Sequence, residues 1–447
     1  MVNNNILKSK KGLSFIDLWG IFYIIMVYSF TLMVNELNIF IFGIYFIFAL
    51  PFFNHLDKFA TICLLLSTMA YYFLGADEGV WSLYTIFSIL MVFHIFVKGN
   101  INVKLKPCLC FAWMILAVLF SYCNSELGYL KGMFAILYNI VITILVALSI
   151  EVNKDTITSF LPRLASIQLV LFILLLLVNG HYDGYGFSIS ESINHNTFGS
   201  SVAILSIILF VKIIFFNGKI VYKLLWGTSF VLAIVVGSRN ALLAMILTFV
   251  IVYLIMKSNH KKILDGVVKI LIGACAVVLM AIFILPKIGI DVSRYNFIEL
   301  ISSGGSNRTI IWKTLTPAIF EKYMWLGYGP SHYCSEQIIL SLMNLNYSHT
   351  HNTIFEAWGE LGFIGLIPFV LILIWSFKKG YFFIKNKSHY LMIGFLFIGL
   401  LLLGLGESFF ANVELWIIIG LLLGGKNILE EKVSENNNRT GQSNVKK

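Results

Sequence analysis

The sequence predicts an all-α polytopic membrane protein with roughly 12–14 transmembrane helices, and three observations carry this prediction. Of the 447 residues, 59% are hydrophobic and only 12% are charged, whereas soluble proteins carry about 25% charged residues. Apolar segments near the length of a membrane span, about 20 residues, follow one another closely. The 39 Phe and 20 Tyr residues suit lipid-facing and interfacial positions.

The apolar segments define the expected helices in order. The first, 14–34, is too long for a cleavable signal and lacks a small-residue cleavage site, so we expect it to remain as an anchor. The last two are separated only by Gly406 and Glu407, and they form either a helical hairpin or a broken helix. The fourteen candidates are 14–34, 36–53, 59–75, 80–97, 107–123, 131–150, 158–179, 197–216, 221–236, 239–256, 263–285, 353–376, 389–406 and 408–425.

The charge distribution gives the expected topology. When the segments alternate from a cytoplasmic N-terminus, all but seven of the 32 basic residues fall on or near the cytoplasmic face, as the positive-inside rule expects. The net charge of +10 is therefore a topology signal, and we expect no nucleic-acid partner. The seven outer-face residues are Lys131, Arg239, Lys287, Arg294, Arg308, Lys313 and Lys322.

This topology divides the chain into five regions. A cytoplasmic N-terminus (1–13) precedes transmembrane helices 1–11 (14–285), and a long extracytoplasmic loop (286–352) precedes the C-terminal transmembrane helices (353–425). The polar, Asn-rich tail (426–447) is expected to be disordered and cytoplasmic. The cysteine spacing encodes neither a disulfide framework nor a zinc site, and we expect no metal.

The outer loop is expected to contain two short amphipathic helices. The first begins near residue 306 or 307 and places Arg308 and Trp312 one turn apart on the same face. Pro317 is expected to kink it, and the second helix covers about 335–345. The pair either covers a site at the lipid–water boundary or forms a solvated cap without chemistry.

Polar residues cluster where the loop meets the next span. His349 and His351 flank a threonine just before Asn352, and a histidine at a water-accessible mouth can act as general base. Glu360 follows roughly 13 Å further along the helix, and intramembrane carboxylates are usually paired or line a polar cavity. Alternatively, both histidines are interfacial loop residues and Glu360 is a buried structural partner.

Two further outer turns carry candidate residues. Three of the five arginines, among them Arg239 and Arg308, lie on the outer face, which favours an anionic ligand there. Arg239 follows Ser238 at a tight turn, where it either binds such a ligand or snorkels to the headgroups. His195 and Asn196 begin another span. They serve either a functional role at its outer end or a structural one.

In this order and on this face, the residues resemble the O-antigen ligase-like superfamily of bacterial envelope glycosyltransferases, which includes O-antigen ligases and Wzy-type polymerases of O-antigen and capsular polysaccharide. The resemblance covers about residues 180–370 in motif. The pattern consists of Ser238-Arg239, Arg308 to Trp312, Gly327 and Gly329, His351-Asn352, and Glu360-Gly362-Gly365.

The resemblance implies a GT-C-type fold and a metal-independent reaction without cofactor, on an undecaprenyl-diphosphate-linked oligosaccharide in the outer leaflet of the bacterial cytoplasmic membrane. Arg239 and Arg308 would bind the diphosphate, and His351 would take the proton from the acceptor hydroxyl. The expected substrate-binding residues are Asn352, Glu360, His349, Trp312, His195 and Asn196.

Three functions follow as hypotheses. The first is a polysaccharide polymerase that joins lipid-linked repeat units, with a flippase and a chain-length regulator as possible protein partners. The second is a ligase that transfers the glycan to lipid A core or another acceptor, and genomic context would discriminate between these two. The third is a lipid-linked oligosaccharide flippase, which should place polar residues near the bilayer midplane. Only scattered candidates, such as Asn139 and Gln168, lie there.

Overall fold

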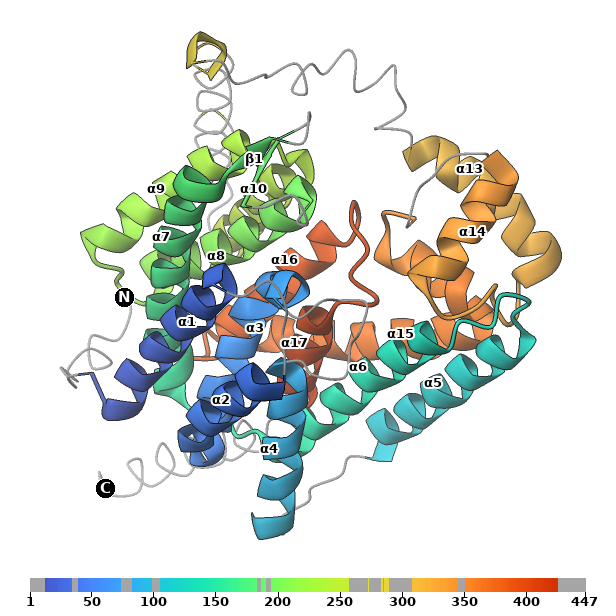
Figure 1. Ribbon diagram of the computed structural model, residues 1–447, viewed down its shortest axis with the longest axis horizontal. Coiled ribbons are helices and arrows are strands. Elements are labelled where there is room, and N and C mark those ends of the chain that lie inside the picture. Colours follow the sequence, from blue (N-terminus) through green and yellow to red (C-terminus); the bar gives the residue numbers. More distant parts are fainter. Residues whose placement is uncertain are drawn as a thin grey trace, which may run out of the picture.

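A computed structural model describes residues 13–33, 39–73, 83–98, 105–182, 186–189, 194–256, 272, 283, 285–288, 308–343 and 350–424. These residues form an all-α polytopic membrane protein (Figure 1), which confirms the predicted fold class. The described strands are β1 (His181–Tyr182) and β2 (Phe187–Ser188), which pair as a small antiparallel hairpin before α8.

Thirteen of the fourteen predicted apolar segments coincide with helices, and the remaining one, 263–285, lies almost entirely outside the described residues. Five of these helices are long and apolar enough to cross a membrane by themselves, and shorter apolar helices accompany them. The helices are α1 (Phe15–Met33), α2 (Ile39–Ala49), α3 (Leu56–Phe73), α4 (Leu83–Lys98), α5 (Leu105–Asn124), α6 (Leu130–Ser149), α7 (Leu161–Asn179), α8 (His195–Phe215), α9 (Ile220–Val235), α10 (Arg239–Met256), α15 (Thr353–Lys385), α16 (Leu391–Leu403) and α17 (Val413–Gly424). Short helical turns lie at η2 (Leu50–Asn54), η3 (Thr156–Phe160) and η4 (Leu285–Ile288).

The last two apolar segments form a helical hairpin. Helix α16 ends at Leu403 and α17 begins at Val413, so a loop of residues 404–412 joins them. Gly380 of α15 lies against Gly394 near the start of α16 and also near Leu422 at the end of α17. The start of α16 and the end of α17 therefore both lie near Gly380 of α15, so the two helices run antiparallel as in a hairpin.

Polar contacts between several helices mark one end of the bundle. At this end, Asp17 lies 2.6 Å from Lys58 and 3.7 Å from Arg163. Lys212, near the end of α8, donates a hydrogen bond of 2.6 Å to the Thr158 carbonyl. Thr158 lies five residues before Arg163, so the end of α8 lies at the same end of the bundle as Asp17. The start of α8 therefore lies at the other end, as the alternating topology predicts. Which end faces the cytoplasm stays a prediction of the positive-inside rule, and the proposed region boundaries stay predictions as well.

Two short helices, α13 (Arg308–Ala318) and α14 (His332–Met343), form a cap beside the ends of α5, α6 and α15 (Figure 1). They share a second, smaller core, which also receives side chains from the α5–α6 turn and from the first turns of α15. The predicted kink at Pro317 coincides with the end of α13, which continues as the π-helical turn η6 (Ile319–Tyr323). The second cap helix begins at His332, three residues earlier than predicted. The buried residues of this core are Ile311, Leu315, Ile319, Tyr328, Cys334 and Ile339.

Helix α15 is broken at Gly362, whose φ of 62° and ψ of −169° lie outside the helical region. At the break, the N–H groups of Phe363 and Ile364 donate to the carbonyls of Met324 and Trp325, at 2.9 and 3.2 Å. A Cβ at Gly362 would lie 2.2 Å from the Trp325 backbone. Glycine is required here both for its positive φ and for this close approach, which fixes the cap onto α15.

Candidate functional site

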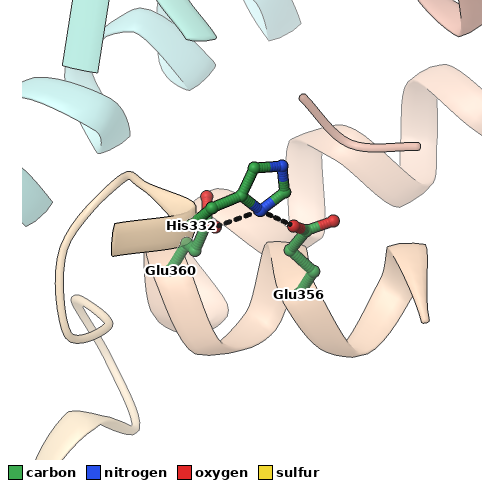
Figure 2. A group of neighbouring side chains, drawn as sticks. All are labelled: His332, Glu356 and Glu360. Atoms are coloured by element: carbon green, nitrogen blue, oxygen red, sulfur yellow. Dashed lines mark ion pairs between the residues drawn. The ribbon is translucent and has the colours of Figure 1, made fainter. Parts of the chain in front are cut away.

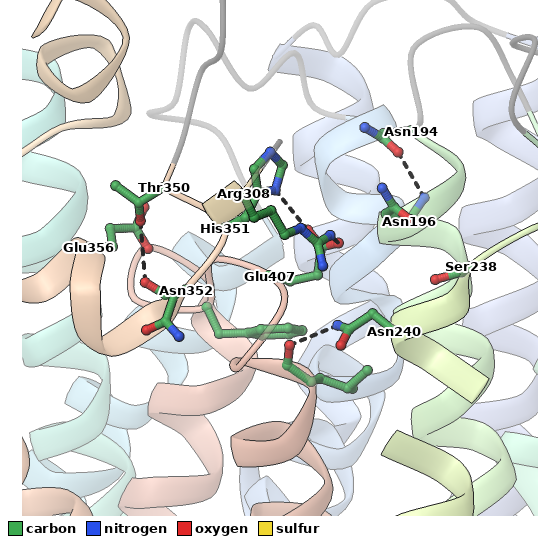
Figure 3. Close-up of polar contacts among 12 residues, drawn as sticks. Asn194, Asn196, Ser238, Asn240, Arg308, Thr350, His351, Asn352, Glu356 and Glu407 are labelled. Atoms are coloured by element: carbon green, nitrogen blue, oxygen red, sulfur yellow. Dashed lines mark hydrogen bonds and ion pairs between the residues drawn. The ribbon is translucent and has the colours of Figure 1, made fainter. Parts of the chain in front are cut away.

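Arg308, Glu407 and His351 form the centre of the candidate site (Figure 3). An Arg308 guanidinium nitrogen lies 3.2 Å from one Glu407 carboxylate oxygen, and His351 Nδ1 lies 3.8 Å from the other. The three side chains are 23%, 13% and 17% exposed, respectively. They come from the first residue of α13, the segment before α15 and the loop 404–412, so three separate parts of the chain meet here.

The backbone around His351 is held by a precise set of hydrogen bonds. The Asn352 side-chain oxygen caps α15 by accepting from the N–H groups of Ile354 and Phe355, at 3.0 and 2.9 Å. Trp312 Nε1 donates to the Thr350 carbonyl at 2.7 Å. These bonds flank His351, whose φ of +53° lies in the left-handed region that is costly for most residues. The flanking bonds therefore hold His351 in a conformation that it would otherwise rarely adopt.

Thr353 positions the loop that carries Glu407. Its N–H donates to the Gly404 carbonyl at 2.9 Å, and its hydroxyl donates to the Glu407 carbonyl at 3.2 Å. The same hydroxyl accepts from the Phe409 N–H at 2.9 Å. From the membrane helices, Asn139 Nδ2 donates to the Ala411 carbonyl at 2.7 Å. The loop is thus fixed from both sides, and Glu407 is preorganised beside His351 and Arg308.

The start of α10 reaches the same centre. Asn240 Nδ2 donates to the Leu403 carbonyl at 2.8 Å. A Cβ at Gly406 would lie 2.5 Å from Asn240 Oδ1 and 2.9 Å from an Arg308 guanidinium nitrogen, so these three residues adjoin. Arg239, the residue before Asn240, is half-buried at the first position of α10. Arg239 is thus next in sequence to a residue of the Arg308 group, at the start of the same helix.

The start of α8 lies next to the turn that precedes α10. Asn194 caps this helix by accepting from the Asn196 N–H at 2.8 Å (Figure 3). His195 is 4% exposed. One turn further, a Cβ at Gly199 would lie 2.2 Å from the buried Ser238 side chain. His195 and Asn196 therefore neighbour the Ser238-Arg239 turn, while Arg308, Trp312, His351 and Asn352 are joined by the contacts described above.

Two predicted residues remain, His349 and Glu360. His349 falls outside the described residues. Glu360 is 1% exposed and lies with Glu356 and His332 in a second cluster (Figure 2). His332 Nδ1 lies 2.7 Å from a Glu356 oxygen and 4.0 Å from a Glu360 oxygen, and the Ser335 hydroxyl is 3.5 Å from the same Glu360 oxygen.

The two carboxylates shape the electrostatics of His332. Burial by itself lowers the pKa of this imidazole. The charge and hydrogen bond of Glu356, together with the charge of Glu360, outweigh burial and raise the pKa from 6.5 to about 9. His332, Glu356 and Glu360 also offer one potential metal-ligand atom each, and these atoms lie within 4.8 Å of one another.

Sequence reasoning did not identify Glu407 or His332 as site residues. In the sequence, Glu407 stands between the last two apolar segments, where a carboxylate is costly and therefore a signal of a functional or paired group. His332 lies in the first turn of α14, and its link to Glu356 and Glu360 depends on how the cap docks on α15. No periodicity in the sequence encodes that docking.

Comparison with known families supports the resemblance. Residues 224–370 match the family model described as O-antigen ligase, a range that contains Arg239, Arg308 and His351. The match implies a glycosyltransferase-like enzyme of envelope polysaccharide metabolism that works on lipid-linked substrates. No curated protein matches the chain. Over residues 224–370, the chain is therefore similar to the O-antigen ligases.

Proposed function

We propose that the protein is a bacterial envelope polysaccharide polymerase. It transfers an oligosaccharide from a polyprenyl (undecaprenyl) diphosphate donor to a sugar hydroxyl of another lipid-linked repeat unit, at the outer leaflet of the cytoplasmic membrane. The observation that carries this proposal is the convergence of a guanidinium, a carboxylate and an imidazole at one end of the bundle, in Arg308, Glu407 and His351. The family match supplies the reaction class.

In the proposed reaction, the acceptor hydroxyl oxygen forms the new bond to the anomeric carbon of the donor sugar. The bond between that carbon and the diphosphate oxygen breaks, and polyprenyl diphosphate leaves with the bonding electrons. His351 takes the hydroxyl proton through Nε2, because Nδ1 faces Glu407. Glu407 balances the imidazolium that results and keeps the ring in one orientation.

Arg308 and Arg239 bind the diphosphate and stabilise the charge that grows on it as it leaves. A guanidinium has five N–H donors in a fixed fork, so Arg308 can keep its contact with Glu407 and still bind phosphate oxygens. Such charge-assisted hydrogen bonds contribute about 1.5–3 kcal/mol each. Asn352, Trp312 and Asn196 are polar groups around this centre, where they can orient the sugars.

The mid-span polar residues that a flippase would use have structural partners. Asn139 Nδ2 donates to the Ala411 carbonyl, and Gln168 Nε2 donates to the Leu65 carbonyl. Both amide groups thus donate to backbone carbonyls of the bundle. This favours chemistry at one end of the molecule over transport through it.

The test is a glycan ladder from cells in which the chromosomal gene carries His351→Ala or Arg308→Ala, with membrane expression confirmed for each variant. A polymerase predicts collapse of the polymer ladder to single lipid-linked repeats. Long chains that accumulate on the polyprenyl carrier would instead identify a ligase. Normal glycan in both variants would contradict the catalytic assignment and return the flippase to consideration.

A further inference from the structure

The second cluster places one imidazole between two carboxylates. Glu356 and Glu360 are four residues apart on α15 and therefore share a face of the helix, and His332, the first residue of α14, lies over that face (Figure 2). One ring atom, Nδ1, is directed at both carboxylates, at 2.7 and 4.0 Å. The three potential ligand atoms lie within 4.8 Å of one another.

Two carboxylate oxygens in this cluster are buried without a hydrogen bond. Glu356 Oε2 and Glu360 Oε2 accept none from the residues that the structure describes, and the two side chains are 0% and 1% exposed. Within the described part of the chain, His332 is the cationic group in ion-pair contact with them. When both buried carboxylates are ionised, one imidazolium balances only one of the two negative charges, which is costly in a site removed from water.

We propose that His332, Glu356 and Glu360 bind a divalent transition-metal ion, for which Zn²⁺ is the best fit. Two carboxylates and a neutral imidazole neutralise a +2 ion, and the ion would compensate both buried carboxylates. Imidazole nitrogen and carboxylate oxygen are both zinc ligands, whereas Mg²⁺ and Ca²⁺ prefer oxygen ligands alone.

The geometry needs only a small adjustment to hold the ion. Ligand atoms that bind one Zn²⁺ at about 2.0–2.2 Å lie about 3–4 Å from one another. The 4.0 Å between Nδ1 and the Glu360 oxygen fits this range, and the 2.7 Å between Nδ1 and the Glu356 oxygen would lengthen as the ion enters between them. The His332 side chain is 33% exposed, which gives the ion a path from water and leaves a coordination position for a water molecule.

The Glu360 ligand has hydrogen-bond partners of its own. The Ser335 hydroxyl contacts Glu360 and is 2.9 Å from the Tyr328 hydroxyl, so the ligand has the outer hydrogen-bond partners that usually orient metal ligands. The ion would join α14 to the first turns of α15, one turn from the Asn352 cap. It takes no part in the proposed transfer, and the inference does not depend on that function.

The test measures metal on the full-length protein in detergent. Protein stripped with a chelator is dialysed against Zn²⁺ or Co²⁺, and bound metal is quantified by mass spectrometry. We expect about one Zn²⁺ per chain, visible absorption bands from bound Co²⁺, and a higher melting temperature with Zn²⁺ than with chelator. In His332→Ala and Glu356→Gln the affinity should fall by at least about 100-fold, because even loss of an outer-shell partner costs 10–100-fold.

Glu126→Gln is the matched control, because Glu126 is a 74% exposed carboxylate beside the cap that pairs with Lys322. It should bind the metal as the wild type does. Glu356→Gln keeps the shape of the side chain, and size-exclusion profiles show whether each variant is folded. Wild-type protein that binds no stoichiometric metal would overturn the proposal in favour of a shared proton. Equal metal binding by folded His332→Ala and Glu356→Gln would overturn it in favour of a site elsewhere.

Discussion

Arg308 and Glu407 are 99 residues apart in the sequence, and their side chains approach to 3.2 Å. The contact joins the first residue of the cap to the loop between the last two membrane helices. The other Glu407 oxygen lies 3.8 Å from His351 Nδ1. One carboxylate therefore relates the group proposed to bind the diphosphate to the group proposed to take the proton.

Replacing Glu407 by Gln should lower the transfer rate by about 10²-fold without unfolding the protein, because the amide keeps the shape but no longer stabilises the imidazolium. The measurement is the turnover rate of purified protein with a lipid-linked donor and acceptor. Glu126→Gln, which removes an exposed carboxylate paired with Lys322, should retain the wild-type rate. A wild-type rate for Glu407→Gln would remove Glu407 from the reaction.

Replacing Arg308 by Lys should lower turnover by about 10–100-fold although the positive charge is kept. The ammonium can pair with Glu407, but it lacks the planar fork that binds phosphate oxygens in pairs. The same assay, with the donor concentration varied, measures the effect. Lys313→Arg, an exchange at an exposed position one turn along α13, serves as the control. Equal rates for the wild type and Arg308→Lys would argue against bidentate binding of the diphosphate.

Trp312→Phe tests how His351 is positioned. Phenylalanine keeps an aromatic ring beside Phe355, whose ring centroid lies 6.4 Å from that of Trp312. It loses the hydrogen bond from Nε1 to the Thr350 carbonyl and part of the indole volume. We expect about 1 kcal/mol less stability and a turnover rate reduced by roughly tenfold, because the left-handed backbone at His351 loses a neighbouring restraint. Thermal unfolding and turnover are measured on the same preparation. Trp325→Phe, at a position 61% exposed, should change neither, and an unchanged Trp312→Phe would show that the bond is dispensable.

Gly362→Ala should prevent correct docking of the cap. An alanine here would need a positive φ and would place its Cβ 2.2 Å from the Trp325 backbone, a combination that costs more than the roughly 1–3 kcal/mol of backbone strain alone. The readout is the yield of monodisperse protein and its melting temperature. Gly227→Ala is the control, since a Cβ there meets nothing within 4 Å. Comparable yields and melting temperatures for the two variants would contradict the requirement for glycine at the break.

The membrane helices were predictable because a span needs only an apolar segment of sufficient length. The positions of the helix ends were less predictable. The segment 353–376 continues to Lys385, and the segments expected to end at 406 and begin at 408 are separated by the loop 404–412. Hydropathy reports only Gly406 and Glu407 of this loop, because Leu405 continues the apolar segment before it and Phe409 and Phe410 extend the one after it. The loop is held by backbone hydrogen bonds to Thr353.

The candidate site was predictable where chemistry is local in the sequence. His351 and Asn352 stand out at the head of a span, and Arg308 and Trp312 lie one turn apart. The partners of these residues depend on tertiary packing. Glu360 was expected to act with the His351 group, and its placement against His332 follows from the docking of α14 on α15. The pairing of Arg308 with Glu407 likewise depends on the α16–α17 hairpin.

The most direct measurement is a single-turnover assay of purified protein in lipid nanodiscs, with a polyprenyl-diphosphate-linked oligosaccharide as donor and a lipid-linked repeat unit as acceptor. The proposal that His351 accepts the proton at this site predicts that the wild type forms the glycosidic bond and releases polyprenyl diphosphate. In His351→Ala the rate of bond formation should fall by about 10²–10⁴-fold with donor binding retained. Bond formation at the wild-type rate in His351→Ala would contradict the assignment of this centre as the site of transfer.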